Sequence, residues 1–328
     1  MPRRAAAPAD RDDDAAETTS RERPLRAWML PFGAMSATSD VPAAFRHAAT
    51  RPGPRRLLGE AIDDIRSRRR LVRYLVQADI RKKGADTFFG NLWWILDPLL
   101  QMLVYVVFIG LILDRQTPDY PLFILAAILP WKWFTTSVND AASAVVSQEK
   151  LIKQIQFPKI VLPVAATTAG VVGFAFGLIP LGAIMLLYID RISPLLVLIP
   201  VIAAVQYLFT LGVAFLVSAV NVFFRDLGNV LRHVLRLWFY LSPGLYSLAL
   251  LDETAVFQQN PVLSFIAHAN PMAILFESYR AVIYGTPEGA PMLPDWGGLA
   301  ALTVASLILI AITAIAFKRL EPQFAKVL

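Results

Sequence analysis

The chain has no cysteine and only three histidines among its 328 residues. The absence of thiols excludes disulfide frameworks, thiol catalysis and cysteine-ligated metals. The three histidines, His47, His233 and His268, are too widely spaced to predict a histidine-built metal centre. We therefore expect this chain to bind no metal ion and no cofactor of its own.

Motifs of nucleotide and hydrolase chemistry are also missing. The sequence contains no phosphate-binding loop of the form Gly, four residues, Gly-Lys-Ser/Thr, and neither a His-Glu-x-x-His nor a Gly-x-Ser-x-Gly pattern. If its function requires ATP, a separate subunit must bind the nucleotide. We expect a subunit that is not itself an enzyme.

Hydrophobic residues, in contrast, make up 56% of the chain, against about 45–50% in an average soluble protein. An apolar helix of roughly 20 residues crosses the hydrocarbon core of a bilayer. The pattern predicts an all-α polytopic membrane protein whose transmembrane domain covers residues 92–320, followed by a cytoplasmic tail at 321–328. Its six transmembrane helices are predicted at residues 92–113, 121–147, 160–189, 195–220, 229–250 and 297–317.

The positive charge is concentrated outside the hydrophobic part of the chain. Of the 31 Lys and Arg residues, 18 precede Asn91. This distribution predicts contact with anionic lipid rather than nucleic-acid binding. The segments around 148–159 and 221–228 and the C-terminal end carry further basic residues, whereas the opposite side offers only Arg115, Arg191 and Arg280. Under the positive-inside rule, both termini lie in the cytoplasm.

The part of the chain before the first span divides in two. Residues 1–56 are rich in Ala, Pro, Arg and Asp without apolar periodicity, which predicts a disordered cytoplasmic tail. Arg26 and Pro31 interrupt the apolar stretch at 25–35, so no signal peptide is predicted. Residues 57–91 are expected to be cytoplasmic or interfacial and to contain an amphipathic helix. Its functional residues are expected to be Arg69, Arg70, Arg73, Tyr74, Gln77, Asp79 and Arg81.

Residues 148–159 form a short basic island between two hydrophobic runs. Leu151, Ile152 and Ile155 recur at helical spacing, and Phe157-Pro158 ends the helix before the next span. A loop that only joined two spans would need no such pattern, so we expect an element that a cytoplasmic partner contacts. The residues expected to carry the contact are Glu149, Lys150, Leu151, Ile152, Lys153, Phe157, Pro158 and Lys159.

The second predicted span carries polar residues at three- and four-residue spacing. One interpretation is close helix packing through small side chains, and the other is the lining of a polar passage. Asp140 favours the passage because an ionisable group within a span marks a functional site by default. The neighbouring sequence Trp131-Lys132-Trp133-Phe134 is typical of an interfacial aromatic anchor, with sugar stacking as the alternative. The expected lining is Trp131, Trp133, Phe134, Thr136, Asn139, Asp140, Ser143 and Ser147.

Proline and glycine motifs predict local backbone structure. Asp97-Pro98 predicts an N-cap and a helix restart, with catalysis as the alternative. Gly173 and Gly177 form a GxxxG pattern that is typical of a close helix contact. Ser242-Pro243-Gly244 should kink or break the fifth span. The apolar segment 271–284 is too short to cross the bilayer, which predicts a re-entrant helix on the outer face.

Two ion pairs are predicted from helical spacing alone. Asp79 precedes Lys82 and Lys83 by one turn, and Glu277 precedes Arg280 by three residues. For Asp79, which interrupts the apolar face of its helix, a functional contact is the alternative.

A series of motifs, in order along residues 65–320, resembles one family. The motifs are RKKG at 81–84, FGNLWWILDP at 89–98, LPW at 129–131, LIK at 151–153, FPK at 157–159, NVFFRD at 221–226, NPM at 270–272 and YR at 279–280. Each is modest alone, but the ordered set is similar to the type-2 membrane subunits of polysaccharide-exporting ABC transporters, the permeases for O-antigen, teichoic acid and capsule. Lys132 and the long segment before Arg56 depart from the family pattern.

The resemblance implies a permease homodimer in the bacterial cytoplasmic (inner) membrane, paired with two copies of a separate ABC ATPase subunit that binds ATP and Mg. The amphipathic helix near 69–83 would be the interfacial gate helix, and 148–159 the coupling helix that docks on the ATPase. Residues 271–284 would belong to the outer-face helices. The cargo would be a polysaccharide linked to undecaprenyl pyrophosphate.

Two other functions fit parts of the sequence. A membrane glycosyltransferase acting on polyprenyl-phosphate sugars would need carboxylates grouped at one membrane face. Asp97, Asp140 and Glu277 are instead dispersed along the chain. A type-2 exporter of drugs or small glycolipids shares the architecture and differs in its cargo. The resemblance favours the export of a polysaccharide.

Overall fold

The structure is a computed structural model that describes residues 52–84, 90–112 and 118–328. Residues 1–51 of the expected cytoplasmic tail lie outside the described residues, and Arg115 does too. The predicted tail extended to residue 56, but a helix already begins at Pro54. Proline suits this position because the first turn of a helix does not need its missing N–H group.

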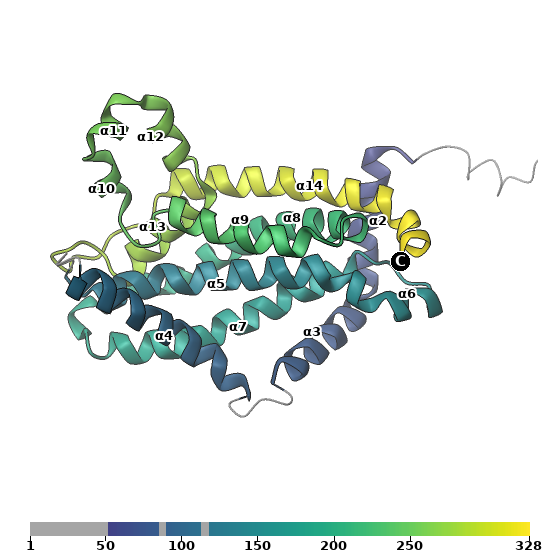
Figure 1. Cartoon of the computed structure of the whole chain (residues 1–328), viewed down its shortest axis with the longest axis horizontal. Helices are drawn as coiled ribbons and strands as arrows, with labels where there is room; N and C mark the ends of the chain where they lie inside the picture. The colour runs from purple at the N-terminus through teal and green to yellow at the C-terminus, as the bar shows by residue number, and fades with distance from the viewer. Residues whose placement is uncertain (1–51, 85–89, 113–117) are drawn as a thin grey trace, which may run out of the picture. The chain divides into compact units, whose positions relative to one another are not determined.

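All regular structure in the described residues is helical. Short 3-10 segments lie at Gly90–Leu92, Val146–Gln148, Ile189–Arg191 and Pro194–Leu198, and a π-helical stretch at Val107–Ile112 extends α4. The α-helices, labelled as in Figure 1, are α2 (Pro54–Ser67), α3 (Arg69–Gly84), α4 (Trp93–Val106), α5 (Tyr120–Ala144), α6 (Glu149–Gln154), α7 (Val161–Met185), α8 (Ile199–Phe223), α9 (Leu227–Leu241), α10 (Leu248–Asp252), α11 (Ala255–Gln259), α12 (Pro261–His268), α13 (Pro271–Ile283) and α14 (Trp296–Val327).

Four of the described helices are long and apolar enough to cross a bilayer: Tyr120–Ala144, Val161–Met185, Pro194–Phe223 and Trp296–Val327. They correspond to the second, third, fourth and sixth predicted spans, and they make the chain a polytopic helical membrane protein. The first predicted span corresponds to a shorter apolar helix, Trp93–Ile109. Six spans therefore remain a prediction.

The fifth predicted span, residues 229–250, is wrong as a single helix. α9 ends at Leu241, and the next helix begins only at Leu248. The predicted break at Ser242-Pro243-Gly244 is confirmed, because proline fixes its backbone and cannot donate to a helical hydrogen bond.

α5 is the most enclosed of the four long helices. In its most apolar stretch 78% of the residues are buried, against 39%, 33% and 28% in the other three. It packs against α4, α7, α8, α9 and α13, and it runs between α7 and α9 in Figure 1. This helix therefore forms the centre of the hydrophobic core.

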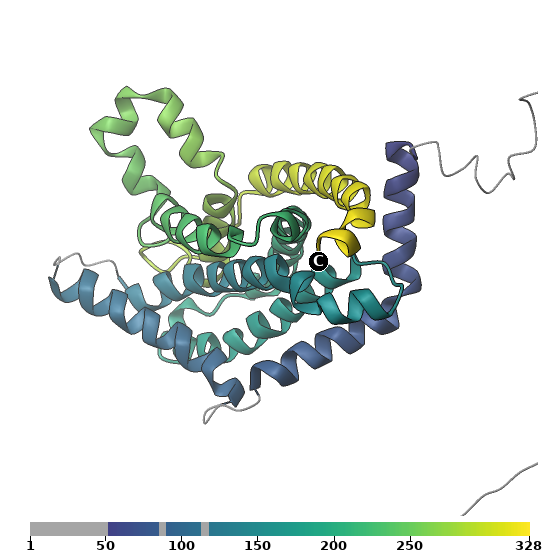
Figure 2. The same cartoon turned by 45° about the vertical axis from the view of Figure 1, so that its right-hand side comes forward.

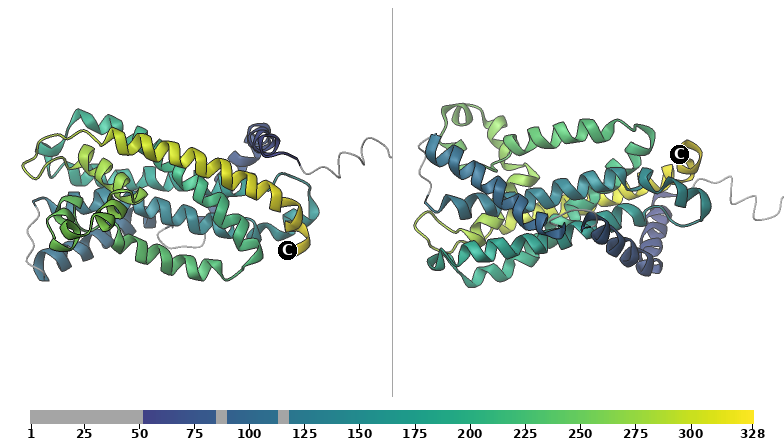
Figure 3. Two further views of the ribbon diagram at one scale, coloured as in Figure 1. Left: turned by 90° about the horizontal axis from the view of Figure 1, so that it is seen from above. Right: turned by 60° about the horizontal axis from the view of Figure 1, so that its bottom comes forward.

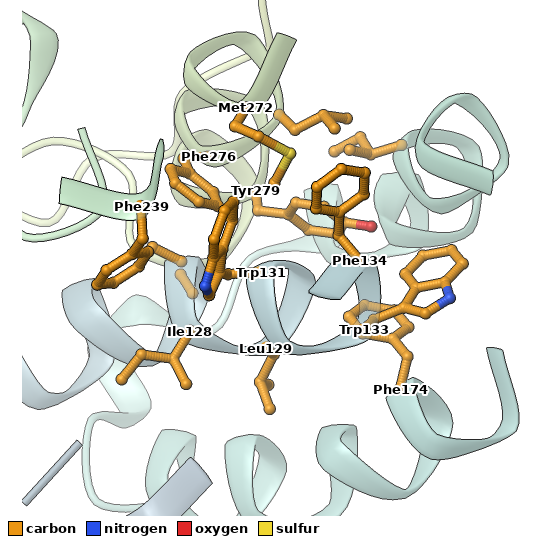
Figure 4. Close-up of a cluster of buried hydrophobic side chains, with 14 of the residues drawn as sticks. Ile128, Leu129, Trp131, Trp133, Phe134, Phe174, Phe239, Met272, Phe276 and Tyr279 are labelled. Atoms are coloured by element: carbon orange, nitrogen blue, oxygen red, sulfur yellow. The ribbon is translucent and has the colours of Figure 1, made fainter. Parts of the chain in front are cut away.

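An aromatic cluster holds α5 in place (Figure 4). The ring of Trp131 lies 5.3 Å from that of Phe239 on α9, and Trp133 stacks on Phe174 of α7 at 4.9 Å. Phe134 is fully buried. Aromatic rings bury large apolar surfaces and add favourable edge and stacking contacts. The cluster thus joins helices that are distant in sequence.

The contact between α5 and α7 depends on glycine. A Cβ added at Gly170 would lie 2.0 Å from Ser137 Oγ, and one at Gly177 would lie 2.8 Å from Leu129 Cδ2. Gly173 has nothing within 4 Å of such an atom. The predicted GxxxG contact is therefore confirmed at Gly177 and wrong at Gly173; Gly170 takes its place because residues seven apart share a helix face.

The end of the bundle where α5 begins is closed by α13 and by a buried arginine. Arg280 donates through Nη1 to the Pro243 carbonyl (2.6 Å) and through Nη2 to the Gly244 carbonyl (2.6 Å). Its guanidinium carbon lies 3.8 Å from the centre of the Phe123 ring, and the predicted pair with Glu277 is confirmed at 3.1 Å. The carbonyls freed by the break after α9 are thus satisfied by a side chain. The predicted re-entrant segment is α13, and α10–α12 project beside it (Figures 1 and 2).

At the other end, α6 packs on a second apolar cluster that includes Ile152, Phe317 and Phe324. α14 runs on to Val327, so the expected tail at 321–328 continues the helix, with the C-terminus near α6 (Figure 3). Lys318 joins α2 to this end through Asp64 (2.8 Å). α2 packs against α14 and α3 against α7, outside the main bundle (Figure 2).

A glycine pair tests the close contact between α5 and α7. We expect Gly170→Ala to destabilise the protein by about 1–3 kcal/mol, because the new methyl group enters space that Ser137 fills. Gly173→Ala, on the same helix and in open space, should leave stability unchanged or slightly raised. Thermal unfolding of the purified protein in detergent measures both, and equal effects would contradict the packing.

Candidate functional site

The helix α3 shows the two faces that its sequence predicts. Arg69, Arg70, Arg73, Tyr74, Gln77 and Arg81 are exposed, whereas Leu71, Val72, Leu75, Val76, Asp79 and Ile80 are half-buried. The half-buried face lies toward α7, against which the helix packs. The exposed face is basic and free to contact lipid headgroups or a partner.

Lys83, at the end of α3, forms the main charged contact of the site. Its Nζ lies 2.6 Å from Asp140 Oδ2 on α5 and 3.0 Å from Asp79 Oδ2 one turn earlier. The predicted pair of Asp79 with Lys83 is therefore confirmed, and Asp140 gains a partner from a helix 57 residues away. Burial lowers the pKa of Lys83, but Asp140 and Asp79 together raise it above its ordinary value. The lysine therefore stays charged at physiological pH.

A polar crevice surrounds this cluster between α3, α5 and α7. Its volume is about 350 Å³. Charges of both signs, hydroxyls and an amide face the same space, which suits a ligand rich in hydroxyl groups. No group of acidic, histidine or cysteine side chains in the described residues is arranged to hold a metal ion. The polar lining consists of Asp79, Lys82, Lys83, Asp140, Ser143, Ser147 and Gln148.

A second ion pair joins α5 to α4, with Asp97 more exposed than either partner of the first pair. Lys132 on α5 pairs with Asp97 on α4. The sequence predicted Asp97 as an N-cap, but α4 begins at Trp93 and runs through Pro98. The helix restart is therefore wrong: Asp97 is an interior helical residue whose carboxylate balances a lysine on the neighbouring helix.

The predicted aromatic anchor is also corrected. Trp131, Trp133 and Phe134 lie near the middle of α5 and are at most 7% exposed. They belong to the core shown in Figure 4 rather than to a membrane interface. Tryptophan is compatible with both environments, because its ring is apolar and its N–H is polar, so sequence could not separate them.

The polar residues of α5 do not form one continuous lining. Asp140, Ser143 and Ser147 face the crevice beside α3, and Thr136 faces a small apolar cavity next to it. Asn139 instead faces a groove between α4 and α9, and Trp131 lines that groove too. The expected lining is thus divided between two sides of α5.

The element α6 is anchored on one side and open on the other. Ile152 is buried, Lys153 donates to Glu149 (2.6 Å) and to the Leu328 carbonyl (2.8 Å), and the Lys159 N–H donates to Glu321 (2.5 Å). The hydrogen bond from Lys153 also lowers the pKa of Glu149. Lys150 and Ile155 are exposed, Ile155 by 55%. A short helix fixed to the bundle thus presents a basic and apolar surface.

Sequence reasoning missed three contacts of the site: Lys83 with Asp140, Asp97 with Lys132, and Glu321 with Lys159. The only available signal was that Asp97 and Asp140 interrupt apolar patterns, whereas Glu321 lies in a polar segment and gave no such signal. Such a signal indicates that a partner is needed but does not identify it.

The fold and site define a class: a multi-pass helical membrane protein with a polar crevice between its bundle and an outer amphipathic helix, and with a short helical connector between two spans. No family model matches the chain. It is 33% identical over 253 residues to the O-antigen export system permease protein RfbA of Myxococcus xanthus, covering 77% of this chain and 93% of that protein. It is 28% and 27% identical to two proteins of the same name from Klebsiella pneumoniae, with the same coverage.

The chain therefore belongs to the family of O-antigen export permeases, the membrane subunits of polysaccharide-exporting ABC transporters. The relatives are permease subunits of a transport system, which agrees with a chain that carries no enzyme motif of its own.

The contact between Lys83 and Asp140 can be measured by a double-mutant cycle. Lys83→Gln and Asp140→Asn should each destabilise the protein, because the first leaves the carboxylate of Asp140 without its partner and the second leaves Lys83 with Asp79 alone. The double variant should lose less than the sum, with a coupling of about 1 kcal/mol, since both side chains keep some solvent contact. Urea or thermal unfolding measures the cycle. Arg70→Gln, on the exposed face of α3, is the control, since its side chain is not part of the crevice lining. Additive single effects would contradict the contact.

Proposed function

We propose that this chain is the permease subunit of an ATP-driven exporter that carries a lipid-linked polysaccharide of the O-antigen type across the bacterial cytoplasmic membrane. The names of the relatives support the cargo class. The linkage to undecaprenyl pyrophosphate follows from the family resemblance. Teichoic acid or capsule polymers are the nearest alternative cargoes. A drug or a small glycolipid is a more distant alternative, because neither is a polysaccharide.

In this proposal the chain crosses the membrane six times. α4 with its π-helical extension and α9 complete the set formed by the four long helices. α9 has 15 residues, which rise about 22 Å, so the residues after its break complete the crossing. With the basic ends of α3, α6 and α14 in the cytoplasm, both termini lie on the same side.

The observation that supports the proposal most is that α6 is anchored to the bundle on its inner face and exposed on its outer face. It joins α5 to α7, and its inner face is held by Ile152 and by the bond from Lys159 to Glu321 on α14. A force on its exposed face would therefore reach three spans together. We assign this face to a separate ABC ATPase subunit, present in two copies beside a permease homodimer. ATP and Mg would be bound by that subunit.

The crevice beside α3 is assigned to the gate. Opening α3 away from α7 requires the contact between Lys83 and Asp140 to break, which would widen the crevice beside Ser143 and Ser147, both already exposed. The exposed arginines of α2 and α3 would hold this part of the chain against anionic lipid. A hydroxyl-rich polymer would then meet hydrogen-bonding groups on α5.

The docking surface is tested by altering only the exposed face of α6. Lys150→Glu with Ile155→Asp should reduce stimulation of the partner ATPase about tenfold or more, because both the charge and the apolar contact are lost. Insertion and stability should be unchanged, since neither side chain is buried. Glu253→Lys, at the opposite end of the bundle, is the matched control for charge. Unaltered ATPase coupling in the double variant would refute the assignment of α6.

The cargo is tested by deleting the gene and analysing lipid-linked polymer. Export predicts that complete polymer accumulates on its lipid inside the cell and that none reaches the surface. Loss of polymer synthesis would instead favour a glycosyltransferase, and normal surface polymer would favour a drug or glycolipid exporter. Complementation with the unaltered chain serves as the control.

A further inference from the structure

Three charged side chains join α2, α14 and the start of α7. Lys318 on α14 lies between two carboxylates: its Nζ is 2.8 Å from Asp64 Oδ2 on α2 and 2.7 Å from Glu321 Oε2 on α14 itself. The other carboxylate oxygen of Glu321 accepts a hydrogen bond from the backbone N–H of Lys159 (2.5 Å), in the turn that leads into α7. Asp64, Lys318 and Glu321 thus form a charged link between elements that are distant in sequence.

The hydrogen bond from Lys159 stabilises the start of α7. This helix has neither a side-chain cap of its own nor an acidic residue in its first turn. N–H groups at a helix N-terminus need acceptors, and the N-terminus carries a partial positive charge. Glu321 supplies an acceptor and a negative charge from another helix. One lysine between two carboxylates leaves one negative charge in excess, and the positive end of α7 offsets it.

The charged link is mostly removed from water. Glu321 is 7% exposed, and the side chain of Lys318 is 13% exposed. Glu321 shares a face of α14 with the buried Phe317 and Phe324, which lie one turn before and after it. Charges in such surroundings interact more strongly than on an open surface, and each is costly to leave without a partner. The link therefore holds its three elements in a defined arrangement.

A groove separates α2 from α6. Its volume is about 880 Å³, and it is lined by α2, by residues 152–159 and by the end of α14. These elements lie at the same end of the bundle (Figure 1). Both α2 and α6 pack against α14. A displacement of α6 or of the start of α7 therefore reaches α2 through α14, and the charged link is the polar part of that connection.

Movement of α2 is passed on to α3 because a single residue, Arg68, separates the two helices. The Arg68 N–H donates to the Asp64 carbonyl (3.1 Å), and the Arg68 carbonyl accepts from the Val72 N–H (3.0 Å). Helical hydrogen bonding thus continues through the junction. α3 has 16 residues, a length of about 24 Å, and Lys83 lies near its far end. A small tilt of α2 is therefore enlarged where Lys83 meets Asp140.

We propose that Asp64, Lys318 and Glu321 are positioning residues of transport. The charged link joins α2 to the start of α7, so that force applied by the ATPase at α6 also moves α3 and separates Lys83 from Asp140. The inference rests on the function proposed above, because it needs a partner that displaces α6. It adds a connection from the docking surface to the gate that the contacts of α6 alone do not provide.

The first test measures the position of α2 in the isolated full-length permease in detergent. The chain has no cysteine, so Gly59→Cys on α2 with Gln156→Cys after α6 gives two unique attachment sites for spin labels. Both positions are exposed. Double electron–electron resonance then reports the distance between the labels. We expect one narrow distribution of distances when the charged link is intact.

Variants of Asp64 decide whether the link fixes this distance. Asp64→Asn should broaden the distribution, because α2 loses its charged partner on α14. Lys318 keeps Glu321 in this variant, so no buried lysine is left alone. Asp64→Glu keeps the charge and should leave the distribution narrow. Asp63→Asn is the matched control, because Asp63 is an exposed neighbour on α2 that forms no ion pair with the described residues.

The second test measures coupling in the complex of permease and ATPase, reconstituted in liposomes with lipid-linked polymer isolated from the deletion strain. Asp64→Asn should lower the polymer exported per ATP hydrolysed by about threefold or more, since force at α6 no longer reaches α3. Binding of the ATPase should be unchanged, because α6 keeps its exposed face. Asp64→Lys with Lys318→Asp keeps one lysine beside two carboxylates and should recover the coupling. A purely structural role would reduce the amount of folded complex and leave the ratio of export to hydrolysis unchanged.

The proposal is refuted if Asp64→Asn leaves the label distances unchanged, or if Asp63→Asn alters them equally. Broader distances with unaltered export per ATP refute it as well, because the link would then contribute to structure only. Broader distances with reduced export per ATP, both reversed by the charge exchange, support it. Since the label distances are measured without the ATPase, a failure of the link is distinguishable from a failure of the experiment on the exposed face of α6.

Discussion

The burial of α5 is the constraint on which the rest of the structure depends. Five helices pack around it, so its own backbone and side chains must find partners inside the bundle. α8 supplies two of them: Gln206 donates to the Pro130 carbonyl (2.7 Å) and Asn221 to the Ala142 carbonyl (2.8 Å). In a membrane the loss of either hydrogen bond would be costly, because lipid offers no substitute partner for the carbonyl group. Any functional movement must therefore carry α5 with its neighbours or slide an outer helix past it.

The same rule explains the distribution of charge. Lys132 balances Asp97, Lys83 balances Asp140, and Arg280 satisfies the carbonyls left by the break after α9. The two lysine contacts join α5 to the neighbouring helices α4 and α3, and Arg280 joins α13 to the segment after α9. The contact of Lys83 lies at the end of a helix that packs mainly on α7 and is partly open to solvent, which makes it easier to break than the buried hydrogen bonds of Arg280. Arg232 and Arg236 on α9 depart from this rule, because their surroundings in the described residues include no carboxylate.

The position of α6 links the connector between α5 and α7 to helices from both the N-terminal and the C-terminal part of the chain. Ile152 lies in the same apolar cluster as the end of α14, and α2 is tied to that cluster by Lys318. These three elements, α6, α14 and α2, are thus tied together at this end of the bundle. The aromatic cluster on α5 would transmit a displacement toward α9 and α13, because its rings contact Phe239 and Phe276 and close-packed rings resist compression.

The sequence by itself determined the class of the protein, the location of four spans, the break at Ser242-Pro243-Gly244, the short helix between α5 and α7 and the pairing of Asp79 and Glu277 with nearby cations. These features depend on hydrophobic length and on spacing within one helix, which are local properties. Only the tertiary structure decided which helix is central, that Lys83 meets Asp140, that Asp97 is an interior residue and that the tryptophans of α5 lie in the core. Contacts between residues far apart in the chain depend on how whole helices pack, and the pattern within a single helix does not fix the neighbour it will meet.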